Sequence, residues 1–255
     1  QLGKDRIEVG GVERDPVDIV AKVVEHVKEQ SLKTPEVREH LLSNYDKAVV
    51  TIPVTMDGPK RAALRAAFAK ADTQIVQFIH EPFAALYGYI RSRPDQAAAR
   101  RELEKRDVLV VDWGGGTLDL TLCRIHSGRI IQRKNGGSEE IGGDKFDETI
   151  RNEVIKRFCM RENIPETVEI SEDAKLRLLD RSERHKIALS DETEADYYIT
   201  DFFQNPDKDL EYLLTREELD EITRPLIDKG LEQIETLLAE AGISPGQVDK
   251  CLVAG

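Results

Sequence analysis

A glycine-rich turn after a buried strand is the part of this sequence best suited to chemistry. Residues 108–111 (VLVV) form an apolar run that leads into Asp112, and apolar and polar residues alternate again from Leu118. This pattern predicts a strand, a tight turn and a second strand. The turn between them consists of Gly114, Gly115, Gly116 and Thr117.

Such a turn can bind phosphate through its backbone. Glycines adopt positive φ values and expose N–H groups, which form a concave anion site without side chains. Asp112 lies where a divalent cation would bind, and the Thr117 hydroxyl lies within reach of a terminal phosphate or of the water that attacks it. The alternative is an ordinary glycine-rich hairpin with a solvated aspartate, and the turn alone does not separate the two.

A second acidic residue follows another predicted strand. Glu81 comes directly after the strand predicted at 74–79 and precedes Pro82 and a short apolar helix. Open α/β sheets bind ligands at the carboxyl ends of their strands, which makes Glu81 a candidate for the same site. The competing interpretation is a carboxylate at the start of a helix, where the helix dipole stabilises it.

Helices and strands are predicted in alternation around these residues. Apolar spacing and capping residues predict helices at 16–30, 34–43, 61–71, 144–162, 171–190 and 215–241. Further strands are predicted at 47–52, 129–134, 194–203, 210–214 and 248–253, and the segment 135–143 (NGGSEEIGG) is predicted as a glycine-rich crossing. The predicted helix starts include Asp15, Asp144 and Ser171, and Thr215 with Glu218 predicts a capping box.

The composition excludes several function classes. The net charge of −12 over 255 residues argues against a nucleic-acid or anionic-membrane surface, because such partners need clustered Lys and Arg. No apolar run approaches the roughly 20 residues of a membrane span, and no secretory pattern is present, so a cytoplasmic protein is expected. Cys123, Cys159 and Cys251 are far apart, which indicates buried reduced thiols rather than a zinc site or disulfides.

Four separated stretches carry a resemblance to a known family. They are KAVVTIPVTMDGPKRAALRAAF, QFIHEPFAALYGY, VLVVDWGGGTLDLTL and NGGSEEIGGDKFDETI. Together and in this order they resemble the nucleotide-binding domain of the seventy-kilodalton heat-shock protein family, the DnaK-like chaperones of the actin and sugar-kinase superfamily. The resemblance covers most of residues 15–255 and implies an α/β, actin-like ATPase fold with two ribonuclease H-like lobes around ATP or ADP and Mg²⁺.

The resemblance also implies a domain organisation. Residues 1–93 would form part of the first lobe, 94–106 a charged and solvated connecting segment, and 107–255 the second lobe, with an upper subdomain at about 144–219. The sequence stops inside a predicted strand. The chain is therefore expected to be a central fragment, truncated at both ends.

Roles for individual residues follow from the same resemblance. Asp112 would act on magnesium through water, Glu81 would orient the magnesium or the attacking water, and Thr117 would lie beside the γ-phosphate. The residues expected around the ribose and base are Glu183, Lys186 and Ser190, joined by Gly255 from the start of a second adenosine motif. The positions expected to relay nucleotide state to a substrate-binding domain are Pro53 and Arg61. For the helix that carries Glu183, a salt-bridged surface helix is the alternative.

Some features of the family pattern are missing. Ile187 stands where the family usually has an arginine stacked on the adenine, and His80 replaces its usual asparagine. The first lobe's acid-Gly-Thr-Thr loop and the lysine after it have no counterpart before Lys47. Because positioning and electrostatics supply most of the catalysis of phosphoryl transfer, the chain alone is expected neither to bind ATP tightly nor to hydrolyse it at a useful rate.

The expected function is the ATPase domain of a stress-response chaperone, in which ATP hydrolysis is coupled to peptide binding during protein folding. By resemblance, its partners would be peptide clients, a J-domain co-chaperone and a nucleotide-exchange factor. The main alternative is a regulatory or scaffolding module that binds nucleotide without hydrolysing it. A sugar kinase of the same superfamily fits less well, because FIHEPFAALYGY and GGDKFD resemble the chaperone branch.

Overall fold

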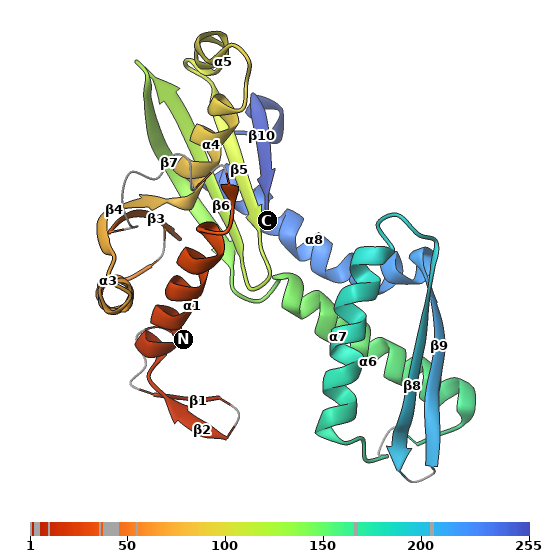
Figure 1. Cartoon of the computed structure of the whole chain (residues 1–255). Coiled ribbons are helices and arrows are strands. Elements are labelled where there is room, and N and C mark those ends of the chain that lie inside the picture. The colour runs from red at the N-terminus through yellow and green to blue at the C-terminus, as the bar shows by residue number, and fades with distance from the viewer. Residues whose placement is uncertain are drawn as a thin grey trace. The chain divides into compact units, whose positions relative to one another are not determined.

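The computed structural model describes residues 2, 6–9, 11–35, 37, 46–54, 56–165, 168–204 and 207–255. By its contacts the chain divides into two compact units, Gln1–Ser92 and Arg93–Gly255 (Figure 1). The helix predicted at 34–43 falls largely outside the described residues.

The first unit contains a parallel strand pair with a helix in the connection. Its elements are β1 (Ile7–Val9), β2 (Val12–Arg14), α1 (Pro16–Ser31), β3 (Lys47–Ile52), α3 (Gly58–Lys70), β4 (Gln74–His80) and α4 (Glu81–Arg91). β3 and β4 pair in parallel, and β1 and β2 form an antiparallel hairpin that the sequence pattern does not predict. Ile52, Leu64 and Ile75 form the buried core.

The second unit is built on a four-stranded sheet in the order β10-β5-β6-β7. Its elements are α5 (Gln96–Leu103), β5 (Asp107–Trp113), β6 (Leu118–His126), β7 (Arg129–Ser138), α8 (Arg216–Glu240), a short 3₁₀ helix (Pro245–Gln247) and β10 (Lys250–Ala254). β10 runs parallel to β5, and the other neighbours are antiparallel. Leu226, Leu237 and Leu238 of α8 pack on the sheet residues Leu109 and Leu120.

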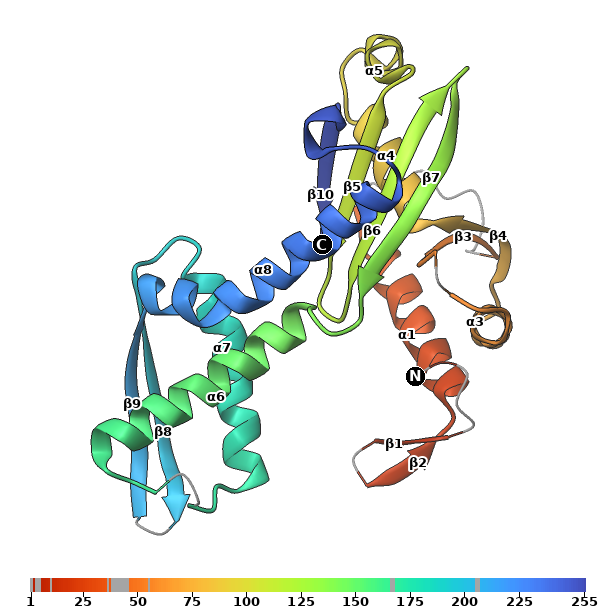
Figure 2. The same cartoon turned by 180° about the vertical axis from the view of Figure 1, so that it is seen from behind.

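The rest of the second unit forms an outer part with its own core. It consists of α6 (Gly143–Glu162), α7 (Glu172–Ala188), β8 (Glu194–Gln204) and β9 (Asp207–Thr215), and α6 and α8 connect it to the sheet (Figure 2). Phe158 stacks on Phe203 with ring centroids 5.6 Å apart, and both rings are buried. The N-caps Ser171 and Thr215 were predicted correctly, because each side chain accepts a hydrogen bond from its own first turn.

Two predictions around the glycine-rich segment were wrong. β7 continues through Gly136 and Gly137 to Ser138, because these residues pair with β6 instead of forming a crossing. Gly137 has a φ of +140°, and a Cβ there would lie 2.0 Å from the Leu118 carbonyl oxygen. Asp144 is not the N-cap of α6, since the helix begins one residue earlier and its N-cap is Gly142.

Two burial predictions also need correction. Cys123 and Cys159 are buried as expected, but Cys251 is exposed on the edge strand β10. The charged segment before β5 is not wholly solvated, because α5 buries Ala99 and Leu103.

Glu218, at the start of α8, makes the stability of the outer part dependent on pH. Burial raises the pKa of Glu218, but hydrogen bonds from Tyr212, the Thr215 N–H and Arg157 outweigh burial and hold the pKa below its ordinary value of 4.5. The carboxylate therefore favours folding above pH 4.5, and this contribution is lost as the pH falls through the lowered pKa.

We expect Glu218→Gln to lower the free energy of unfolding by about 1–2 kcal/mol near neutral pH. Glutamine still supports a capping box, so the substitution removes mainly the charge. The difference from wild type should shrink as the pH falls, which thermal unfolding at several pH values would measure. An equal loss at acidic and neutral pH would contradict this role for the carboxylate.

Candidate functional site

The glycine turn closes β5 onto β6. The Gly114 N–H donates to the Thr117 carbonyl at 3.0 Å. Gly115 and Gly116 are exposed, and their N–H groups donate no hydrogen bond within the part of the chain that the structure describes. Two neighbouring backbone donors at the carboxyl end of a buried strand are therefore available to an anion. Gly114, Gly115 and Gly116 do not have the positive φ values expected from the sequence.

Two carboxylates lie next to the turn. Asp112 on β5 pairs directly with Asp119 on β6, and the Thr117 hydroxyl donates to Asp119 Oδ2 at 2.7 Å. Burial and the negative charge of Asp119 raise the pKa of Asp112 above its ordinary value. Negative charge at this position is therefore not fully compensated by the protein.

A magnesium ion fits this chemistry. Mg²⁺ binds to one or two carboxylates, keeps several waters and takes its remaining ligands from phosphate. Among the described residues no group of three or more His, Cys, Asp or Glu side chains could hold a metal ion. Asp112 is therefore better suited to contact a magnesium ion through water than to belong to a site made of protein ligands alone.

The first turn of α6 holds the glycine turn in place. The N–H groups of Gly143 and Asp144 donate to the carbonyls of Gly114 and Gly115 at 2.9 and 2.7 Å. Gly142 packs so closely that a Cβ there would lie 2.2 Å from the carbonyl carbon of Gly116. These contacts use the turn's carbonyls and leave its outer N–H groups for a ligand.

Lys186 is brought to the same place from α7. Its Nζ lies 2.7 Å from Asp147 Oδ1 and 3.3 Å from the Gly143 carbonyl oxygen. The Asp147 side chain is only 9% exposed and that of Lys186 is 26% exposed. A shielded ion pair therefore links α7 to α6 one helical turn from the contact between α6 and the glycine turn.

Gly255 lies on the other side of the turn. Ala254 pairs with Asp112, which places Gly255 against the end of β5. Gly255 has a φ of +120°, and a Cβ there would lie 2.1 Å from the Trp113 carbonyl oxygen and 3.1 Å from the Gly114 nitrogen. Only glycine fits this position without moving the turn.

The other two residues expected near the nucleoside are on the surface of α7 or just after it. Glu183 is exposed and, with Asp144 and Asp147, lines a cavity of about 400 Å³ between α6 and α7. Ser190 is exposed, and its N–H donates to the Ile187 carbonyl at 3.1 Å. Within the described residues no hydrogen bond links Glu183 or Ser190 to the glycine turn.

Three candidate residues belong to the first unit. Glu81 is the first residue of α4 and follows the N-cap His80, so it lies where the helix-start interpretation put it. Pro53 follows β3, and its carbonyl accepts from the Met56 N–H at 3.2 Å. Arg61 Nε donates to the Met56 carbonyl at 2.9 Å, so Pro53 and Arg61 bind the same short loop.

Three residues that shape the site were not predicted as site residues. They are Asp119, Gly142 and Asp147. The sequence could have placed Asp119 opposite Asp112. A four-residue turn at 114–117 pairs Trp113 with Leu118, and therefore Asp112 with Asp119. Asp147 lies four residues after Gly143 and so on the same helix face, but its partner Lys186 comes from a distant helix.

None of the described helices is both long enough and apolar enough to cross a membrane.

The sequence matches the family described as Hsp70 protein over residues 3–255. This match spans nearly all of the first unit and the whole second unit, including every residue of the glycine turn. The chain therefore belongs to the Hsp70 family and is a chaperone ATPase domain with an α/β, actin-like fold.

Proposed function

We propose that this domain binds ATP or ADP with Mg²⁺, and that hydrolysis in the chaperone is coupled to the binding and release of client peptides. The exposed N–H groups of Gly115 and Gly116 are the observation that carries the proposal. They would donate to the phosphate oxygens, while α6 fixes the turn from behind through Gly143 and Asp144.

Asp112 is proposed to hold the magnesium ion through water. The ion would neutralise phosphate charge that develops during transfer. The ion would also compensate the negative charge of Asp119, which together with the larger effect of burial raises the pKa of Asp112.

Thr117 is proposed to position the attacking water. The Thr117 hydroxyl donates its only hydrogen to Asp119, so it does not donate to a phosphate oxygen. Its lone pairs remain to accept a hydrogen bond from water. We propose that Glu81 helps to orient the same water or the magnesium.

Lys186 and Gly255 are proposed to border the nucleoside, because both lie beside the glycine turn. Glu183 and Ser190 are proposed as outer contacts. We propose that Pro53, whose carbonyl accepts from the Met56 N–H, and Arg61, which donates to the Met56 carbonyl, pass the nucleotide state to a substrate-binding domain. A J-domain co-chaperone and a nucleotide-exchange factor are the proposed partners in this cycle.

The 255-residue chain alone is expected to turn over ATP slowly. Its sequence contains the Gly114–Thr117 turn but lacks the acid-Gly-Thr-Thr loop and the following lysine that the family uses opposite it. Normal turnover in a phosphate-release assay of this chain would contradict the expectation.

Thr117→Ala tests the catalytic part of the proposal in a polypeptide that also contains that loop. We expect ATP turnover to fall by about 10²-fold while calorimetry shows ATP affinity within a few-fold of wild type. Glu81→Ala should behave in the same way. Thr149→Ala on α6, a half-buried threonine whose hydroxyl donates to the Lys145 carbonyl, is the matched control and should leave turnover unchanged.

The result also separates the two functional hypotheses. If the wild-type protein binds ATP but shows no turnover, the non-hydrolysing regulatory module is favoured. If Thr117→Ala turns over ATP as fast as Thr149→Ala, the role assigned to Thr117 is wrong.

A further inference from the structure

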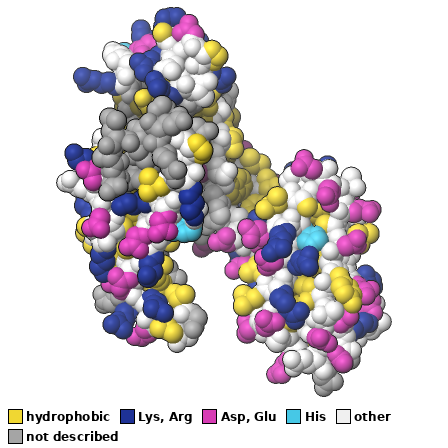
Figure 3. All heavy atoms as spheres, viewed as in Figure 1, with side chains coloured by type: hydrophobic (Ala, Val, Ile, Leu, Met, Phe, Trp, Pro, Cys, Tyr) yellow, Lys and Arg dark blue, Asp and Glu magenta, His cyan; other side chains and the backbone are white. Residues whose placement is uncertain are grey.

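Basic side chains gather at the end of β5 that lies opposite to the glycine turn. Residues 96–106, which include α5, hold four basic and two acidic residues, and residues 124–134 hold four basic residues and no acidic one. The chain as a whole has a net charge of −12. Figure 3 shows the basic side chains around α5, at the top of that view. β5 runs from Asp107 to Trp113, so this end lies about 20 Å from the glycine turn.

Glu104, directly after α5, joins the two basic segments. Its carboxylate accepts hydrogen bonds from the N–H groups of Ser127 and Gly128, in the turn between β6 and β7, at 2.6 and 3.3 Å. The Ser127 N–H contributes most to a pKa of Glu104 below its ordinary value, so the carboxylate stays charged at neutral pH. The Lys105 N–H also donates to the Ile125 carbonyl at 2.7 Å. The end of α5 is therefore held against the turn.

The acidic side chains at this end of the sheet already have partners. Asp107, whose side chain is 5% exposed, binds both Arg124 and Arg133, at 2.6 and 2.8 Å. One carboxylate thus serves two arginines, and their sum is positive. The other acidic residues form the ion pairs Asp249–Arg106 and Glu102–Lys250 or, in the case of Asp95, cap α5.

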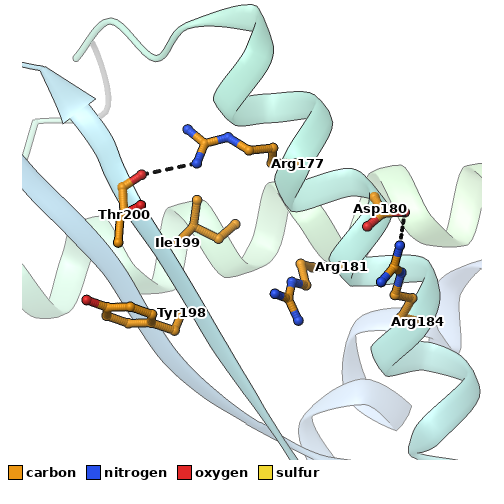
Figure 4. Close-up of a pocket in the computed structure, with 7 residues that line it drawn as sticks. All are labelled: Arg177, Asp180, Arg181, Arg184, Tyr198, Ile199 and Thr200. Atoms are coloured by element: carbon orange, nitrogen blue, oxygen red, sulfur yellow. Dashed lines mark hydrogen bonds and ion pairs between the residues drawn. The ribbon is translucent and has the colours of Figure 1, made fainter.

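Three exposed arginines remain, and we name them the arginine cluster. They are Arg100 and Arg101 on α5 and Arg129 at the start of β7. Their side chains make no hydrogen bond or ion pair to any residue that the structure describes. On α7, by contrast, Arg184 pairs with Asp180 at 3.1 Å (Figure 4). The cluster therefore has charge and donors available for an anion.

The surface around the arginine cluster offers charge without apolar contacts. Among the described residues of 96–106 and 124–129 no large apolar side chain is exposed, and neither range contains Phe, Tyr or Trp. A protein partner needs apolar or aromatic contacts at the centre of its interface, and the bases of a single-stranded nucleic acid need aromatic rings on which to stack. Guanidinium groups bind phosphate through two parallel hydrogen bonds. This chemistry selects phosphate groups alone.

We propose that the arginine cluster binds a linear chain of phosphates, for which inorganic polyphosphate is the simplest ligand. A chain contacts arginines on α5 and β7 together, whereas a single phosphate contacts one or two of them. A long duplex or a membrane would extend past the cluster and meet the negative remainder of the chain. The distance of about 20 Å to the glycine turn exceeds the screening length of about 8 Å at physiological salt, so the two sites bind independently.

The test measures the fluorescence anisotropy of fluorescein-labelled short-chain polyphosphate as the protein is added. We expect binding that weakens as salt is raised, because the bound chain releases counterions. Arg101→Glu and Arg129→Glu should each weaken binding by about tenfold, since a favourable contact becomes a repulsive one. Arg184→Glu is the matched control, because it makes the same change of charge outside the cluster, and it should leave binding unchanged.

Separate titrations with oligoglutamate, single-stranded RNA and anionic phospholipid vesicles identify the class of ligand. At equal concentrations of negative charge, each should bind more weakly than polyphosphate. The proposal is overturned if polyphosphate does not bind, if Arg184→Glu weakens binding as much as Arg101→Glu, if excess MgADP displaces the chain, or if one of these three ligands binds more tightly. Circular dichroism of each variant verifies that the exposed substitutions leave the fold intact.

Discussion

Replacement of Gly142 by alanine is expected to destabilise the second unit by about 3 kcal/mol. The added Cβ would lie 2.2 Å from the Gly116 carbonyl carbon and 2.4 Å from the Gly115 carbonyl oxygen, and the latter accepts the Asp144 N–H of α6. Gly142 has a φ of −78°, which alanine adopts readily, so the effect comes from the contact and not from backbone strain.

Gly116→Ala is the matched control, because a Cβ at Gly116 would meet nothing within 4 Å. We expect its stability to stay within about 0.5 kcal/mol of wild type. Denaturant unfolding followed by the fluorescence of Trp113, the single tryptophan of the chain, would measure both variants. Equal stability of the two would show that the contact between α6 and the turn is not as close as described.

Replacement of Lys186 by methionine is expected to cost about 3–5 kcal/mol, because Asp147 would remain buried without its cation. The side chain of Asp147 is 9% exposed, and Lys186 is its ion-pair partner at 2.7 Å. The loss would also separate α7 from the Gly143 carbonyl. Unfolding by urea, followed by circular dichroism, would measure the change in free energy.

Two further variants separate this buried pair from an ordinary surface pair. Lys175→Met removes an exposed pair with Glu172 on the same helix and should cost at most about 0.5 kcal/mol. Asp147→Leu combined with Lys186→Met removes both charges and should recover most of the lost stability. If Lys186→Met and Lys175→Met are equally stable, the ion pair does not hold α7 to α6.

The sequence predicted features that depend on neighbouring residues. Ser171 and Thr215 cap their helices through hydrogen bonds within one turn, and the strand before the glycine turn follows from a short apolar run. The predictions that were wrong concern features that depend on contacts between residues far apart in the sequence. Asp144 has the residue type of an N-cap, but its N–H is bonded to Gly115 of a different element, and the helix starts earlier.

The site was predicted unevenly for the same reason. The glycines and Asp112 could be found because turn and strand are contiguous in the sequence. Asp147 could not be assigned a role, because its meaning depends on Lys186, which lies 39 positions later on another helix. Apolar residues follow Cys251 in the sequence, which favoured burial. Cys251 is exposed because β10 lies at the edge of the sheet, and this position depends on the strand order.

The binding of phosphate by the glycine turn is tested most directly by amide spectra of the chain labelled with ¹⁵N at glycine. Titration with millimolar MgADP is predicted to shift Gly114, Gly115, Gly116 and Gly255, and to leave Gly88, Gly128 and Gly246 unchanged. This method detects weak binding and does not require turnover. Saturation with MgADP that shifts other glycines while Gly115 and Gly116 stay in place would contradict the account.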